Sequence, residues 1–242
     1  MTRYFALAYR FPVLSKWSSL LLSLAAVALF GFAAVAHAQF GPSSPGTVIH
    51  DASVLKPPAG ARVALVEFGD MECPDCGRAN PLLKEAAATY KIPWVRYDFP
   101  LPMHSWSFNA AVNARWFDAA RGKALGDEYR DQVYANQGSI YNPDQLRRFT
   151  EKFAQSHGVA LPFAIDPQGK LAAAVKADYA LGQRIGIEHT PTIWVVTANS
   201  KGAPFVEVVD RSKLYQLIDQ AIADTTPAKP APKPPVKKPA RK

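Results

Sequence analysis

Two cysteines separated by a proline and an aspartate, Cys73-Pro74-Asp75-Cys76, carry the strongest chemical signal in the sequence. They are the only cysteines among 242 residues, so they either bond to each other or react with another molecule. They follow a strongly apolar, β-branched run at residues 63–68. A Cys-x-x-Cys that opens a helix straight after a strand is typical of a dithiol/disulfide redox site. The spacing makes Cys73 the expected nucleophile and Cys76 the more buried resolving thiol.

The two residues inside the motif are expected to tune it. Pro74 suits the first turn of a helix, where its missing N–H leaves no hydrogen bond unmade. The helix dipole favours a Cys73 thiolate by about 0.3 to 1 kcal/mol. The Asp75 carboxylate, at ~7 Å, opposes that thiolate by roughly 0.6 kcal/mol in water and about 2.4 kcal/mol at an effective dielectric of 20. The two effects are of similar size, so we expect a thiolate that is only modestly stabilised.

Half of a structural metal site is the alternative interpretation of the cysteine pair. The two remaining ligands would have to come from histidines, and no histidine shows metal-ligand spacing to the pair. The histidines considered are His50, His104, His157 and His189. We therefore expect no metal, and no cofactor other than a redox-active Cys73–Cys76 disulfide. A lone histidine near a helix start, such as His104, is expected to be a hydrogen-bonded structural residue.

Two further features could complete a site. Glu67 lies inside the apolar run before the motif, where an isolated carboxylate is expensive to bury. It either serves as a proton acceptor for Cys76, with a pKa raised by burial, or points to the solvent side of the strand. Thr190-Pro191 stands just before a second apolar run, residues 193–196. A proline there can be a plain turn residue, and frequencies alone do not favour a cis bond.

The two ends of the chain differ from its middle. Residues 1–38 have three basic residues, no acidic residue, a long apolar run and a closing Ala36-His37-Ala38, which is the layout of a cleaved secretory signal peptide. An uncleaved membrane anchor is the alternative, since the apolar run approaches the length of a membrane span. Either case places the folded part outside the cytoplasm, with the periplasm as the expected location. Disulfides persist there.

Residues 225–242 contain six prolines, six basic residues and no acid, a composition that predicts a disordered tail. Nine of the 28 basic residues lie in the two ends, so 19 remain between residues 39 and 224, against all 20 acidic residues. The net charge of +8 therefore gives no reason to expect nucleic acid binding by the fold. The basic tail is either merely solvated or makes weak contact with an anionic envelope surface.

Residues 39–224 are long enough for one domain, and their periodicity predicts an order of elements. The pattern predicts strands at 62–68, 92–99, 192–197 and 205–209, with a further short edge strand at 47–54. It predicts helices at 74–90, 107–120, 127–135, 142–158, 166–184 and 210–223. A helix between the first two strands makes them parallel. The order is β-α-β, a helical block at about 103–163, and then α-β-β-α.

Taken together, these motifs resemble the DsbA-like branch of the thioredoxin superfamily. The resemblance is carried by the stretch from Glu67 to Cys76, by Thr190-Pro191-Thr192, and by the segment 99–104 that leads into the helical block. It implies an α/β thioredoxin fold with an inserted helical subdomain and a cis Thr190-Pro191 bond that faces the dithiol. The backbone of residue 190 would then pair with a substrate peptide in β fashion. It also supports Glu67 as a buried acid. Asp75 differs from the histidine of the strongest oxidases, so strongly oxidising character is not implied.

The resemblance predicts an extracytoplasmic thiol:disulfide oxidoreductase that acts on cysteines of secreted proteins. A membrane-bound or soluble redox partner would reset the dithiol, and that partner sets the direction of exchange. The competing hypothesis is a binding module or chaperone with a non-catalytic disulfide. A thiol peroxidase is disfavoured, because that chemistry usually needs a Thr or Ser and an Arg around the reactive sulfur.

Overall fold

A four-stranded sheet forms the centre of the computed structural model, which describes residues 46–225. Its strands are β1 (Val63–Gly69), β2 (Trp94–Asp98), β3 (Thr192–Thr197) and β4 (Phe205–Glu207), in the spatial order β2-β1-β3-β4. Strand β2 is parallel to β1, whereas β3 runs antiparallel to both of its neighbours, β1 and β4. The signal sequence expected at 1–38 lies outside the described residues, as does the expected tail apart from Thr225.

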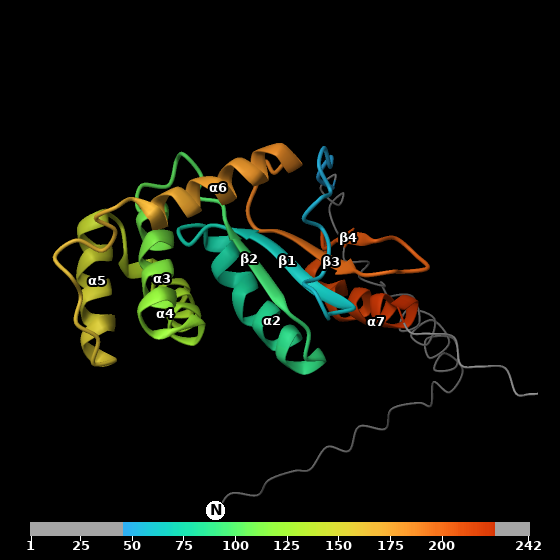
Figure 1. Ribbon diagram of the computed structural model, residues 1–242, viewed down its shortest axis with the longest axis horizontal. Helices are drawn as coiled ribbons and strands as arrows, with labels where there is room; N and C mark the ends of the chain where they lie inside the picture. The colour runs from blue at the N-terminus through green and yellow to red at the C-terminus, as the bar shows by residue number, and fades with distance from the viewer. Residues whose placement is uncertain (1–45, 226–242) are drawn as a thin grey trace, which may run out of the picture. The chain divides into compact units, whose positions relative to one another are not determined.

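Helices cover both faces of the sheet (Figure 1). Alternate residues of β1 face opposite sides of the sheet. Leu65 packs in the hydrophobic cluster beneath α2 (Pro74–Tyr90) and α7 (Leu214–Thr225). Val66 and Phe68 belong to the cluster on the other side, which includes Ile185 of α6 (Lys170–Ile185). Every residue of β1 except Gly69 is buried, as the continuous apolar run predicts for a central strand.

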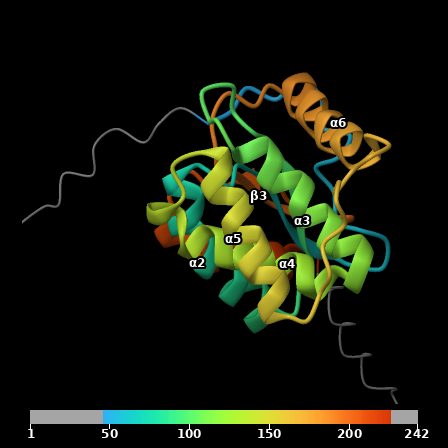
Figure 2. The same ribbon diagram turned by 90° about the vertical axis from the view of Figure 1, so that its left-hand side faces the viewer.

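The helical block consists of α3 (Ser107–Arg121), α4 (Lys123–Ala135), the 3₁₀ turn η1 (Gln137–Ser139) and α5 (Pro143–Ser156). Figure 2 shows these helices together at one end of the folded unit, with the sheet behind them. Their core has its own buried aromatic residues, among them Trp106, Phe117 and Tyr129. At the start of α5, the Asn142 side chain accepts a hydrogen bond from the Gln145 amide at 2.9 Å, so Asn142 caps the helix where the sequence predicts its boundary.

One expected strand does not form, and several expected element boundaries are wrong. Helix α4 begins at Lys123 rather than at 127, and α7 begins at Leu214 rather than at 210. Residues 47–54 form no strand, because Thr47 donates its amide and hydroxyl to the Glu207 carboxylate instead of joining a backbone ladder. Helix α6 begins at Lys170 rather than at 166, since Gly169 adopts a left-handed φ of 67°, and a right-handed helix cannot extend back through that residue. Strand β4 ends at Glu207 rather than at 209.

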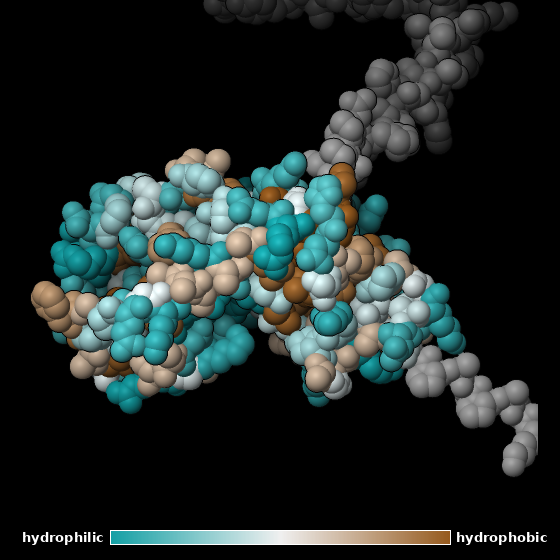
Figure 3. Space-filling view, turned by 45° about the horizontal axis from the view of Figure 1, so that its top comes forward, coloured by the Kyte–Doolittle hydropathy of each residue, from teal (hydrophilic) through white to brown (hydrophobic). Residues whose placement is uncertain are grey.

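The surface mixes polar and apolar groups. On the face drawn in Figure 3, hydrophobic residues appear between hydrophilic ones over the helical block. The large hydrophobic side chains that remain exposed are Val48, Met103, Tyr141, Phe163, Val206 and Val209. Between residues 46 and 225, none of the helices combines the length and the apolar character needed to cross a membrane.

Candidate active site

The first cysteine of the motif sits at the N-terminus of α2. Cys73 is the N-cap residue, with extended backbone angles, and Pro74 occupies the first helical turn as expected. Cys73 is 8% exposed, whereas Cys76, one turn further on, has no exposed surface. Both thiols are free, so the structure describes the reduced dithiol. This arrangement gives one thiol with a small exposed area and one fully buried beneath it, as a dithiol site requires.

The surroundings of Cys73 lower the pKa of its thiol to about 5. The largest cause is a hydrogen bond from the Cys76 side chain, and burial opposes it. The backbone N–H groups of Cys76 and Asp75 add further stabilisation of the thiolate. The pKa of Cys76 is raised well above its ordinary value, chiefly by burial. The thiolate is therefore stabilised more strongly than the helix dipole and Asp75 alone predict, because it collects several hydrogen-bond donors at once.

The Thr190-Pro191 segment lies against the nucleophile. The peptide bond between them is cis, which confirms the expectation drawn from the resemblance. The register explains the proximity, because Phe68 of β1 pairs with Thr192 of β3 and so brings the strand ends together. The Cys73 Sγ lies 3.3 Å from the Thr190 carbonyl oxygen, a contact in which the thiol donates. Ionisation of Cys73 ends that donation, and the carbonyl becomes available for another donor.

Glu67 is buried on the same face of β1 as Leu65, and this face is covered by α2 and its Cys76. It is 2% exposed, so the side chain does not point to solvent. Its Oε2 accepts a hydrogen bond of 3.0 Å from the Trp94 indole N–H, while its Oε1 has no hydrogen-bond partner among the described residues. Burial raises the pKa of Glu67 to about 7, although Arg96 and the Trp94 hydrogen bond act in the opposite direction. Glu67 is thus a carboxyl group that titrates near neutral pH.

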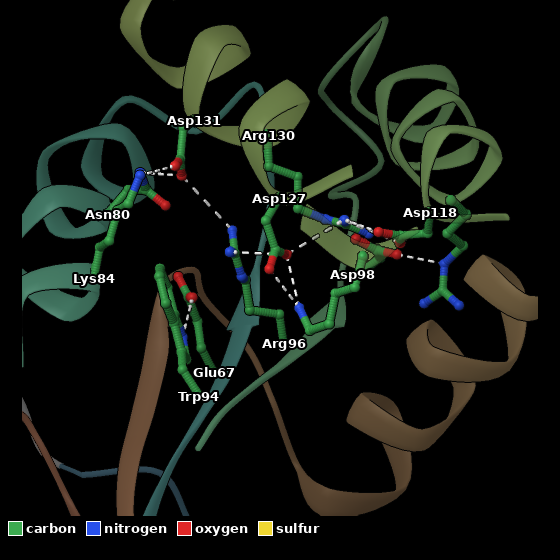
Figure 4. Close-up of polar contacts among 12 residues, drawn as sticks. Glu67, Asn80, Lys84, Trp94, Arg96, Asp98, Asp118, Asp127, Arg130 and Asp131 are labelled. Carbon is green, nitrogen blue, oxygen red and sulfur yellow. Dashed lines mark hydrogen bonds and ion pairs between the residues drawn. The ribbon is translucent and has the colours of Figure 1, made fainter. Parts of the chain in front are cut away.

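A series of ion pairs runs from the neighbourhood of Glu67 across the boundary between the sheet and the helical block (Figure 4). Arg96 of β2 lies with its guanidinium carbon 4.0 Å from the centre of the Trp94 ring and pairs with Asp127 of α4 at 3.1 Å. Arg130, also on α4, pairs with Asp118 of α3 at 3.2 Å. These pairs keep the cation of Arg96 close to the buried carboxylate, which limits the rise in its pKa.

The loop before the motif holds two more buried or half-buried carboxylates, to which the sequence analysis gave no role. Asp70 is 1% exposed and accepts hydrogen bonds from the Leu101 amide at 2.7 Å and from His104 Nδ1 at 2.6 Å. His104 is therefore a hydrogen-bonded structural residue, as expected. Glu72 Oε2 accepts from the amides of Trp106 and Ser107 at 2.7 and 3.0 Å. The loop thereby satisfies donors at the start of α3.

Gln137 of η1 holds the same loop from the other side. Its Nε2 donates to the Met71 carbonyl at 2.8 Å and to the Cys73 carbonyl at 2.9 Å. Gly77 leaves room for this side chain, because a Cβ at Gly77 would come within 2.5 Å of Gln137 Oε1. The helical block therefore contacts the nucleophile's backbone directly.

A Gln137→Ala variant is expected to lose about 1–3 kcal/mol of unfolding free energy, because the Met71 carbonyl loses its Gln137 donor and the Cys73 carbonyl keeps only the Gly77 N–H at 3.2 Å. A several-fold slower reaction of Cys73 with a model disulfide is also expected, since the loop that positions the thiol loosens. Urea unfolding and stopped-flow exchange measure the two effects. Gln132→Ala, an exposed glutamine on α4, is the matched control. Equal stability of the two variants would contradict a stabilising role for the hydrogen bonds from Gln137 to the Met71 and Cys73 carbonyls.

The structure brings the candidate residues of the sequence into one place. The N-cap Cys73 contacts the cis Thr190-Pro191 segment, and Cys76 and Glu67 are close enough for charge on one to raise the pKa of the other. Sequence reasoning missed Gln137 and Arg211, whose Nη2 lies 2.7 Å from Asp75 Oδ1, since neither has a local motif. Between residues 46 and 225 there is no group of three or more His, Cys, Asp or Glu side chains suited to a metal ion.

Sequence comparisons match residues 58–211 to a family model described as thioredoxin. Among curated proteins, the chain is 28% identical over 161 residues to a Na(+)/H(+) antiporter NhaA 1 of Salinispora arenicola, across 66% of this chain and 24% of that protein. It is 31% identical over 149 residues to an NhaA 1 of a Mycobacterium species, across 59% of this chain and 23% of that protein. The chain thus spans about a quarter of the length of these relatives.

Solved structures provide the fold comparison. The thiol-disulfide exchange protein alpha-DsbA2 of Wolbachia pipientis superimposes with a TM-score of 0.54 at 18% identity, covering 68% of this chain and 84% of that one. Proteus mirabilis ScsC gives a TM-score of 0.54 at 18% identity, with 69% and 71% covered. A periplasmic thioredoxin-like protein of Salmonella enterica gives 0.50 at 20%, with 69% and 88% covered. These likenesses confirm the expected α/β fold with helices inserted into it.

Proposed function

The chain belongs to the thioredoxin family, and on that premise we propose that it is a protein thiol:disulfide oxidoreductase. One observation carries the proposal. Cys73, with its thiol pKa lowered to about 5, caps α2 within 3.3 Å of the Thr190 carbonyl oxygen, and a second thiol is buried one turn below it. A thiolate that is populated at neutral pH and keeps some exposed area is the nucleophile that exchange requires.

In the reducing direction, the Cys73 thiolate attacks a substrate disulfide and expels the first substrate sulfur as a thiolate. The Cys76 thiol then loses its proton and attacks Cys73, which expels the second substrate sulfur and leaves a Cys73–Cys76 disulfide. In the oxidising direction, a substrate thiolate attacks Cys73 of that disulfide and expels Cys76 as a thiolate. The substrate's second thiolate then attacks its own bridged sulfur, which expels Cys73 and leaves a substrate disulfide. Two electrons move between substrate and dithiol in either direction.

Glu67 is proposed as the proton acceptor for Cys76. Its Oε1 is buried without a partner among the described residues, and charge on Glu67 raises the pKa of Cys76. A carboxyl group with a pKa of about 7 exists in both protonation states near neutral pH, so it can take the proton and later return it. The Thr190 carbonyl is proposed to pair with the backbone of a bound substrate peptide in β fashion.

We propose that this exchange takes place outside the cytoplasm, in the periplasm, on cysteines of secreted proteins. The signal-like residues 1–38 support this location, and one similar structure is described as periplasmic. A membrane-bound or soluble partner that resets the Cys73–Cys76 pair completes the proposal. The basic residues of 225–242 are proposed to contact an anionic envelope surface weakly.

Catalysed reduction of insulin by dithiothreitol tests the proposal. The wild-type chain is expected to shorten the lag before precipitation of the insulin B chain, relative to dithiothreitol alone. A binding module with an inert disulfide would leave the lag unchanged, and that result would reject the enzyme assignment. The reduction potential of the Cys73/Cys76 couple in a glutathione buffer then gives the direction. A value near about −120 mV favours an oxidase, and one near about −270 mV favours a reductase.

A further inference from the structure

Asp75, between the two cysteines, forms an ion pair with Arg211, which lies 136 residues later in the sequence. Arg211, the first residue of the 3₁₀ turn η2 (Arg211–Lys213) before α7, donates from Nη2 to Asp75 Oδ1 at 2.7 Å. Its Nη1 lies 3.5 Å from the Asp75 carbonyl oxygen. One guanidinium therefore contacts both the side chain and the backbone of Asp75.

A second arginine contacts the same carboxylate from within α2. Arg78 lies one turn after Asp75 and approaches the same Oδ1 with Nη2 at 3.1 Å. The two arginines differ in exposure, because the side chain of Arg78 is 68% exposed and that of Arg211 is 33% exposed. Solvent screens an exposed pair, so Arg211 is the stronger partner.

The pair also has a defined position relative to the thiols. Asp75 and Arg211 line one hollow of about 400 Å³ together with Pro191, the residue that follows the Thr190 carbonyl. The hydrogen bond to Asp75 is the main cause of the raised pKa of Arg211, and charge on Cys76 and Cys73 raises it further, so the guanidinium lies within electrostatic range of both sulfurs. The Asp75 backbone N–H stabilises the Cys73 thiolate, while the carboxylate of the same residue is occupied by Arg211.

We infer that Arg211 is a positioning residue of the dithiol: it holds and neutralises the Asp75 carboxylate, so that this charge does not oppose the Cys73 thiolate. The inference rests on the proposed exchange function and deepens it, because it names the residue that sets the redox character of the motif. The oxidised form has no thiolate. Arg211 therefore stabilises the reduced form selectively and makes the couple more oxidising than Asp75 alone would permit.

Four variants test the inference: Arg211→Gln, Asp75→Asn, the double variant, and Arg78→Gln as the matched control on the same carboxylate. The Cys73 pKa is read from thiolate ultraviolet absorbance, and the reduction potential from equilibrium with glutathione. Arg211→Gln is expected to raise the Cys73 pKa by about 0.5 to 1 unit, since it leaves a carboxylate near the sulfur without its stronger cation. A rise of one full pKa unit would shift the exchange equilibrium tenfold toward the disulfide, which lowers the reduction potential by about 30 mV. Arg78→Gln is expected to shift the pKa by less than half as much.

The effect must pass through Asp75. In the Asp75→Asn background, Arg211→Gln is expected to shift the pKa and the potential by less than half as much, because only the direct attraction between Arg211 and the thiolate is then lost. A fifth variant, Arg211→Lys with Asp75 in place, is expected to keep the pKa close to the wild-type value. An equal shift in both backgrounds, or no shift in either, overturns the inference. Both readouts come from the thiol pair and not from insulin. A chain that fails to reduce insulin yet shows the Asp75-dependent shift would therefore refute the proposed function alone.

Discussion

A Cys73→Ser variant is expected to reduce insulin no faster than dithiothreitol alone, whereas a Cys76→Ser variant is expected to attack once and stop. The difference follows from burial and ionisation. Cys73 is the thiol with a pKa of about 5, and a serine hydroxyl in its place stays protonated. Cys76 is fully buried with its pKa raised, so it resolves the mixed disulfide but does not begin the exchange.

Serine is the informative substitution at position 76. The Cys76 side chain is the largest contributor to the low pKa of Cys73, and a hydroxyl can still donate a hydrogen bond where an alanine cannot. Cys76→Ser should therefore keep a reactive Cys73 and accumulate a covalent adduct with insulin, visible by non-reducing electrophoresis when no excess dithiol is present. Adduct formation by Cys73→Ser, or free turnover by Cys76→Ser, would contradict the assignment of nucleophile and resolving thiol.

A Glu67→Gln variant is expected to be more stable than the wild type above neutral pH and slower in exchange. Burial raises the pKa of Glu67 from 4.5 to about 7 in the folded state, so its ionisation opposes folding. Because the folded pKa of Glu67 lies above its unfolded pKa, the stability that protonated Glu67 contributes to the wild type is fully present below the unfolded pKa. This contribution is lost as pH rises through the folded pKa. At 1.36 kcal/mol per unit, the gain from Glu67→Gln approaches about 3 kcal/mol at pH 8 and nearly vanishes below pH 4.5.

Urea unfolding of the variant and the wild type across this pH range measures the difference. Cys73 titrates in both proteins, so its contribution largely cancels. Other charged groups face Glu67 from β2 and α4, notably Arg96, Asp98 and Arg130, and they remain unchanged in the variant. Glu151→Gln, on the exposed side of α5, is the matched control and should show no such pH dependence. A constant difference between pH 5 and 8 would contradict the raised pKa.

The activity of the same variant separates a proton-transfer role from a purely structural one. The Trp94 hydrogen bond survives in Glu67→Gln, because the amide oxygen still accepts. The first attack by Cys73 should therefore keep nearly its full rate, while release of the mixed disulfide should slow by about 100-fold, at the lower end of the range of general base catalysis. Single-turnover exchange with a fluorescent disulfide distinguishes the two steps. Equal slowing of both would indicate a structural defect.

Local patterns in the sequence predict the part of the site that depends on neighbouring residues. Cys73 and Cys76 follow a strand and begin a helix, and the thiol chemistry follows from that position alone. The fate of Asp75 depends instead on Arg211, which stands 136 residues later, and no spacing rule connects them. Gln137 was missed for the same reason, because a glutamine in a 3₁₀ turn has no pattern until the fold places it under the Cys73 carbonyl.

The order of elements was predictable because hydrophobic periodicity reports burial, and the central strands are buried on both sides. The segment 47–54 was expected to be a strand but forms none. Thr47, Val48 and Ile49 favour strand geometry by residue type, but strand formation depends on a neighbouring edge that accepts the segment. Here Thr47 meets the side chain of Glu207, and His50 donates its amide to the Ile185 carbonyl, so the segment is held without joining the sheet.

Two of the residues that surround the Cys-Pro-Asp-Cys motif come late in the chain. Thr190 follows Cys73 by 117 residues, and Arg211 lies further still. During synthesis from the N-terminus, the Cys-Pro-Asp-Cys segment therefore emerges as two ordinary thiols, long before β3 and η2 exist to surround it. The low pKa is a property of the completed fold. A growing or truncated chain would carry the same motif but behave as a substrate for oxidation rather than as a catalyst of it.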